Sequence, residues 1–268
     1  MAENLIHEIL PVGMLQCNCS ILGDPATREA IVVDPGDETD RILEILRSHK
    51  LNVRAIVSTH THIDHVGGLA LLHKVTNAPV LIHEADIELY RHLDMQAQLL
   101  GMRTPESTRI EDFVKEGDTL RWGPYSARVI HTPGHTPGSI SLYVEKSSAA
   151  DQSYLDDAGR PKPAKASAQA HLQADLQNLA PTHSHEHSDP HAHAHAHTRG
   201  DNATRLIAGD TLFQGSIGRT DLWGGSLKEI MNSIRAKLLT LPDETLVIPG
   251  HGETTTIGAE RAENPYLR

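Results

Sequence analysis

The sequence has few of the features that mark secreted or membrane-spanning proteins. It contains only two cysteines, Cys17 and Cys19, which lie too close together in the chain for an ordinary disulfide bond. It has no apolar run near the roughly 20 residues that a transmembrane helix needs, and no basic region followed by an apolar core at its start. We therefore expect a cytoplasmic protein with no membrane partner, in which both cysteines are small side chains of a half-buried strand.

Positive charge is also scarce. The chain carries 24 Lys and Arg against 35 Asp and Glu, which gives a formal net charge of −11. Because no run of Lys or Arg offers a local basic face, we do not expect a nucleic-acid partner.

Apolar residues are missing from one long segment, Ser147–Ala203. Its 57 residues contain no Val, Ile, Met, Phe, Trp or Cys, and include eight histidines. Such a composition cannot bury enough apolar surface to order itself. We predict one domain over residues 1–268 with a disordered insertion at 147–203. The alternating run Ala192–His197 can bind zinc, nickel or copper weakly, so a metal-buffering role for the insertion stays open.

Outside this insertion, apolar runs typical of strands alternate with runs of helical periodicity. Strands are predicted at Leu5–Val12, Cys17–Leu22, Ala30–Val33, Val53–Val57, Pro79–Ile82, Thr119–Trp122, Ala127–Ile130, Ile140–Val144 and Thr245–Ile248, and from Leu206 to a carboxylate at Asp210. Helices are predicted at Ile42–Ser48, Val66–Val75, Glu84–Leu93 and Leu227–Leu238, with a terminal helix up to about Asn264. The segment Met95–Glu111 has no clear period, and we expect it to be mobile and near the site entrance.

The most informative segment follows the strand Val53–Val57. It reads THTHIDHVGG and places four metal-ligand side chains within six residues: His60, His62, Asp64 and His65. Imidazole and carboxylate suit zinc, iron or manganese. On an extended chain the first two histidines point to one side, and a following helix would place the other two residues at its N-terminus. Four ligands from one such turn can reach two metal ions.

Three more candidate ligands stand at the ends of later strands. His135 lies in HTPGHTPGS, where prolines and glycines make a stiff turn. Asp210 lies in GDTLF, and His251 in IPGHG. Strands and helices alternate in two blocks, each with polar residues just past strand ends. This pattern suggests two mixed sheets packed together, helices outside, and a site at the sheet ends.

In order and type, HxHxDH followed by a distant His, Asp and His resembles the metallo-β-lactamase superfamily. The resemblance covers residues 5–266 outside the insertion. It implies a four-layer αββα sandwich that binds two divalent metal ions, for which zinc is expected first and iron is the alternative. The resemblance implies one ion held by His60, His62 and His135, a second held by Asp64, His65 and His251, and a bridging Asp210.

The segments HTPGHTPGS, GDTLF, GSIGRTDL and IPGHG look like the glyoxalase II group, the hydroxyacylglutathione hydrolases. Longer members continue with a helical domain that binds glutathione, whereas this chain ends 17 residues after His251. The resemblance is therefore to the short bacterial variety. It implies a thioester substrate such as S-lactoylglutathione, attacked by a hydroxide between the ions that Asp64 orients. Arg219 either binds a substrate carboxylate or braces its loop through Asp221.

Other activities stay open at this level. A mono-iron persulfide dioxygenase shares the histidines and a similar GRTD loop, and a lactonase would use the same hydroxide on a cyclic ester. Antibiotic-hydrolysing lactamases are disfavoured by Asp64 and by the missing secretion signal. Nuclease members are disfavoured by the acidic charge.

Overall fold

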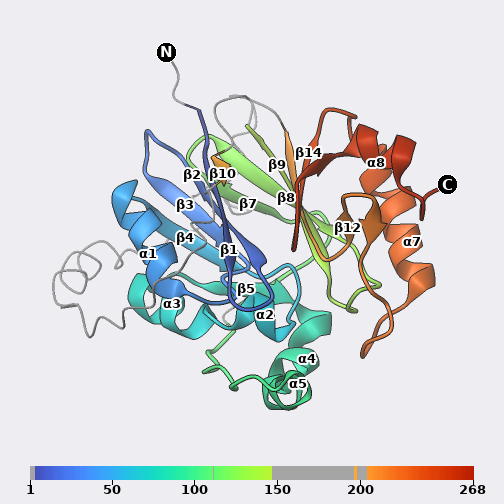
Figure 1. Ribbon diagram of the computed structural model, residues 1–268. Coiled ribbons are helices and arrows are strands. Elements are labelled where there is room, and N and C mark those ends of the chain that lie inside the picture. The colour runs from blue at the N-terminus through green and yellow to red at the C-terminus, as the bar shows by residue number, and fades with distance from the viewer. Residues whose placement is uncertain (1–3, 111, 147–195, 198–203) are drawn as a thin grey trace, which may run out of the picture.

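The computed structural model describes residues 4–110, 112–146, 196–197 and 204–268. Two large β-sheets lie face to face, with α1 and α3 on one side of the pair and α7 and α8 on the other (Figure 1). The predicted disordered insertion lies outside the described residues, except for Ala196–His197.

The first sheet has seven strands in the order β10-β1-β2-β3-β4-β5-β6. Its strands are β1 (Ile6–Val12), β2 (Cys17–Gly23), β3 (Glu29–Val33), β4 (Asn52–Val57), β5 (Val80–His83), β6 (Asp112–Val114) and β10 (Ala196–His197). The strands from β3 to β6 run parallel, whereas β10, β1 and β2 pair antiparallel. The loops that follow β3, β4 and β5 therefore leave the sheet at the same edge.

The second sheet has six strands in the order β15-β14-β11-β9-β8-β7. Its strands are β7 (Thr119–Trp122), β8 (Tyr125–His131), β9 (Ile140–Lys146), β11 (Arg205–Gly209), β14 (Leu246–Pro249) and β15 (Thr255–Thr256). Only the pair β11 and β14 is parallel among the described strands of this sheet. A small hairpin of β12 (Leu212–Phe213) and β13 (Ser216–Ile217) follows β11.

Helices cover both outer faces. Those on the first sheet are α1 (Thr39–Ser48), α2 (Ile63–Val66), α3 (Leu69–Thr76), the 3-10 turn η1 (Glu84–Asp86), α4 (Ile87–Arg91) and α5 (Leu93–Leu100). Those on the second sheet are α7 (Leu227–Ala236), the 3-10 turn η2 (Leu238–Thr240) and α8 (Ile257–Glu263). None of the helices in the described ranges is long and apolar enough to cross a membrane.

Three apolar clusters fill the three interfaces between these layers. Val32 packs with the helices of the first sheet, whereas its neighbours Ile31 and Val33 pack between the sheets. Leu206 packs against α7 and α8, whereas Ile207 faces the first sheet. Successive side chains of a strand point to opposite faces, so a strand buried on both sides reads as a continuous apolar run. The predicted αββα sandwich is confirmed.

Four local predictions are wrong. The Met95–Glu111 segment begins inside α5, where Leu93 and Ala97 are buried one turn apart but Met95 and Leu99 are exposed and obscure the helical pattern. The single helix predicted for Glu84–Leu93 is divided among η1, α4 and α5.

The other two corrections concern the first sheet. Ala196–His197, predicted to be disordered, pairs with β1, because an edge strand leaves backbone groups free for pairing. Cys17 and Cys19 are free thiols, but β2 is buried along its whole length rather than half-buried.

Candidate metal centre

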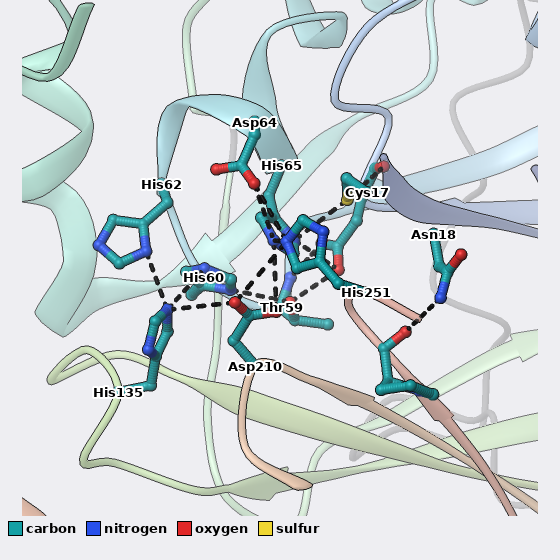
Figure 2. Close-up of polar contacts among 12 residues, drawn as sticks. Cys17, Asn18, Thr59, His60, His62, Asp64, His65, His135, Asp210 and His251 are labelled. Carbon is teal, nitrogen blue, oxygen red and sulfur yellow. Dashed lines mark hydrogen bonds and ion pairs between the residues drawn. The ribbon is translucent and has the colours of Figure 1, made fainter. Parts of the chain in front are cut away.

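The seven predicted ligands meet where loops leave the two sheets. His60 and His62 follow β4, and the next two ligands lie in α2. The later ligands come from the turn between β8 and β9, from the end of β11 and from the end of β14: His135, Asp210 and His251. Figure 2 shows His60, His62 and His135 on one side, Asp64, His65 and His251 on the other, and Asp210 between them.

Three imidazoles form what we call the His60 group: His60, His62 and His135. Nε2 of His135 lies 2.9 Å from Nδ1 of His62 and 3.2 Å from Nε2 of His60. In a tetrahedral zinc site with Zn–N distances of about 2.05 Å, ligand nitrogens stand about 3.3 Å apart. The spacing therefore fits one ion held by three nitrogens.

Two imidazoles and a carboxylate form the Asp64 group: Asp64, His65 and His251. Nε2 of His251 lies 3.3 Å from Nε2 of His65 and 3.1 Å from Oδ2 of Asp64. Nε2 of His65 lies 3.7 Å from the same carboxylate oxygen. These three side chains could also hold an ion.

Asp210 faces both groups. Its Oδ1 lies 3.5 Å from Nε2 of His65, and its Oδ2 lies 3.6 Å from Nε2 of His135 and 3.7 Å from Nε2 of His251. Oδ1 is buried and has no hydrogen-bond partner among the residues that the structure describes, and a Cβ on Gly250 would lie only 2.0 Å from it. A buried carboxylate oxygen normally has a partner, so this one fits a cation shared between the groups.

Burial keeps the imidazoles of the His60 group uncharged. It lowers the pKa of His60 well below the usual range, and the neighbouring histidines lower it further. Burial, and then the nearby His135, lower the pKa of His62 to about 3, and burial also lowers the pKa of His135. Neutral imidazole is the form that binds metal.

The Asp64 group behaves differently. Burial is the largest influence on both Asp64 and His251, and it opposes their charged forms. The hydrogen bond between them and the charges of their neighbours together outweigh burial, so the pKa of His251 is raised and the pKa of Asp64 is lowered. The carboxylate is therefore ionised, as metal binding requires.

Most of these imidazole rings also have a protein partner at the nitrogen that faces away from the centre. Such contacts fix the tautomer and leave the inner nitrogen free for a metal. Nδ1 donates to a carbonyl oxygen at 2.9 Å in two of them, His135 to Arg219 and His251 to Leu15. Nδ1 of His60 lies 3.2 Å from Oγ1 of Thr59.

His62 differs from the other rings. It presents Nδ1 to the centre, and no described residue bonds to its Nε2.

Asp34, which directly follows β3, anchors the HxHxDH segment. Its Oδ1 accepts from Thr59 N–H and its Oδ2 from Thr59 Oγ1–H, both at 2.7 Å. Oδ2 also lies 3.1 Å from Nδ1 of His65. The sequence offers one signal for this role, because Asp34 is a carboxylate at the end of a predicted strand. In the structure that strand runs parallel to β4.

Asp86 joins the same segment to the His135 turn. Its Oδ2 accepts from Thr61 N–H at 3.1 Å and from Thr136 Oγ1–H at 2.8 Å, and its Oδ1 accepts from Gly138 N–H at 2.6 Å. We find no sequence signal for this role, because Asp86 lies in a segment predicted as plain helix.

Two other polar residues lie beside the centre. Sγ of Cys17 is 3.4 Å from Nδ1 of His65, and burial raises the pKa of that thiol to about 12, so it stays neutral. Arg219 forms a two-bond ion pair with Asp221 at 2.8 and 2.9 Å on the surface. The loop-bracing contact is thus present, and binding of a substrate carboxylate by Arg219 stays a prediction.

Comparison with known proteins gives a consistent picture. Residues 12–150 and 154–251 match the family described as the Metallo-beta-lactamase superfamily. A Haemophilus influenzae protein named hydroxyacylglutathione hydrolase GloC is 30% identical over 262 residues, which cover 97% of each chain. The crystal structure of BLEG-1 B3 metallo-beta-lactamase is 28% identical with a TM-score of 0.71, covering 98% of this chain and 99% of that one. TTHA1623 in a di-iron-bound form is 28% identical with a TM-score of 0.67, covering 97% and 99%. This chain belongs to the metallo-beta-lactamase superfamily.

Proposed function

We propose that this protein is a dinuclear metal-dependent hydrolase that cleaves thioesters such as S-lactoylglutathione. The observation that carries the proposal is the convergence of two donor groups on one shared carboxylate, Asp210. The relative named hydroxyacylglutathione hydrolase supports a thioester as the substrate class.

In this proposal the His60 group would hold one ion, the Asp64 group would hold the other, and Asp210 faces both groups. When bound, two such ions would provide a water that ionises near neutral pH and would polarise the carbonyl of the substrate. Asp64 uses Oδ2 toward His251, which leaves Oδ1 to accept a hydrogen bond from the attacking water and orient it. The leaving thiolate has a solution pKa near 8.5, so it needs little protonation to depart.

Zinc is the metal that we propose, because the donor set is rich in imidazole. Iron is the alternative, since imidazole also suits iron and the similar protein TTHA1623 was solved in a di-iron-bound form.

The decisive experiment measures metal content and S-lactoylglutathione hydrolysis on one purified preparation. We expect two tightly bound ions per chain together with turnover. A preparation with both ions bound but without detectable turnover would overturn the thioester proposal.

Two further substrates distinguish the rival functions in the same preparation. One iron per chain with oxygen consumption on glutathione persulfide would support the dioxygenase. Hydrolysis of a cyclic ester in place of the thioester would support the lactonase. A β-lactam belongs in the panel because of the similarity to BLEG-1.

The metal-buffering alternative is tested by deleting residues 147–203. If turnover continues at the full rate with excess zinc, the insertion is accessory. If the intact chain binds many ions but turns over none of these substrates, buffering becomes the better account.

A further inference from the structure

The side chain of Gln96, on α5, bonds to the backbone on both sides of His62. Its Oε1 accepts from Ile63 N–H at 3.0 Å, and its Nε2 donates to the carbonyl oxygen of Thr61 at 3.2 Å. Nε2 also donates to the carbonyl oxygen of Leu89 at 3.0 Å, which ties the same amide to α4. One rigid carboxamide therefore holds both peptide groups that adjoin His62.

These two peptide groups define the backbone angles of His62, which are φ −68° and ψ 149°. When both peptide planes are fixed, the direction of the Cα–Cβ bond between them is fixed as well. His62 is also the N-cap of α2, and its own side chain provides no capping bond. The first N–H groups of a helix need outside partners, and Gln96 supplies one to Ile63.

His62 depends on this backbone restraint more than the other rings do. His60, His65, His135 and His251 each have a protein partner at the nitrogen that faces away from the centre. Nε2 of His62 has none among the described residues. The orientation of the His62 ring therefore depends mainly on its backbone.

We propose that Gln96 is a positioning residue for the His60 group. By bonding to the peptide group on each side of His62, Gln96 sets the direction of the His62 side chain. The inference rests on the proposed metal function. It also gives a role at the centre to α5, which contains the start of the Met95–Glu111 segment that has no clear sequence period.

A double-mutant cycle tests this role without any substrate. The full-length variants are Gln96→Met, His62→Ala and the two together, with Gln98→Met as a matched control on the exposed face of α5. Stepwise Zn²⁺ affinities are measured by competition with a chelator of nanomolar affinity. Outer-shell partners of metal ligands typically contribute about 10–100-fold in affinity, so we expect Gln96→Met to weaken one of the two steps by about tenfold or more.

The cycle separates positioning from general support of the fold. If Gln96 acts through His62, Gln96→Met causes no further loss in the His62→Ala chain, and Gln98→Met causes none in either chain. An equal loss in both backgrounds, a similar loss from Gln98→Met, or an unchanged affinity would each overturn the proposal. Gln96→Leu, checked like the others for unchanged thermal unfolding, provides a second variant if Gln96→Met does not fold.

The outcome is independent of the thioester proposal. A wild-type chain that binds two zinc ions but cleaves no thioester would refute the proposed substrate and leave the Gln96 result intact.

Discussion

The His60 group consists of three uncharged imidazoles, whereas the Asp64 group combines two imidazoles with an ionised carboxylate. Because Asp210 faces both, the difference between them is the charge of Asp64. An ion in the His60 group would keep more of its positive charge and polarise a carbonyl more strongly. An ion in the Asp64 group would be held more tightly by charge attraction in this buried setting. We therefore propose that the first group would activate the substrate and that the second would orient the water.

The two groups are also supported in different ways. Asp34 reaches both, through Thr59 beside His60 and through Nδ1 of His65. Within the described part of the chain, Asp86 contacts the loops of the His60 group and no side chain of the Asp64 group. The Asp64 group relies instead on close backbone packing, since a Cβ on Gly36 would lie 1.6 Å from the carbonyl oxygen of Asp64.

The largest effect should come from removing the charge that the two groups share. Asp210→Asn keeps the shape of the side chain but lowers its ability to bind a cation. We expect both stepwise metal affinities to fall, and turnover to fall by more than about a hundredfold, which exceeds the usual cost of altering an outer-shell partner. Metal analysis and thioester kinetics on one preparation measure this. Loss of only one ion would show that Asp210 belongs to a single group.

The next effect separates the two groups. Asp86→Asn should weaken metal binding in the His60 group by about 10–100-fold and leave the Asp64 group unchanged, whereas Asp34→Asn should weaken both. Stepwise zinc titration of the two variants measures this difference. Identical titrations would mean that the two carboxylates support the fold in general rather than separate halves of the centre.

A smaller effect distinguishes the groups by pH in the metal-free protein. The pKa of His62 is about 3 in the folded chain and 6.5 in the unfolded chain. As the pH falls below 6.5, only the unfolded chain takes up this proton. The free energy of unfolding therefore decreases by about 1.4 kcal/mol per pH unit for this residue. The raised pKa of His251 acts in the opposite direction, because it adds stability at low pH that is lost as the pH rises through the raised value.

Urea unfolding at about pH 6 and about pH 5 measures this dependence. His62→Ala should lose less stability between these conditions than the wild type, by about 1.4 kcal/mol. An equal loss in both chains would show that His62 does not carry a lowered pKa.

The convergence of the seven predicted ligands could be expected from the sequence because their signal is local. HxHxDH is dense in donor residues, and His135, Asp210 and His251 each follow an apolar run that reads as a strand. The layer architecture was predictable for a related reason, because strands buried on both faces give continuous apolar runs that stand out beside amphipathic helices.

The supporting contacts were not predictable in the same way. Asp86 acts on Thr61 and Gly138, which lie 25 and 52 residues away in the chain, and Gln96 acts 33 residues away on Ile63. Neither belongs to a residue pattern, because a single amide or carboxylate meets its partners only after the chain has folded. The helix that carries Gln96 also exposes apolar side chains, so its sequence shows no clear helical period.

The smallest effect concerns Arg219, which lies outside both groups. Its guanidinium pairs with Asp221 on the surface, whereas only its backbone carbonyl contacts His135. Arg219→Ala should therefore leave zinc affinity unchanged and alter stability little, because an exposed ion pair is screened by solvent. We also expect KM for the thioester to change by less than about threefold, because the guanidinium is already occupied by a carboxylate. A large rise in KM with unchanged metal binding would instead make Arg219 a substrate-binding residue that exchanges Asp221 for the substrate.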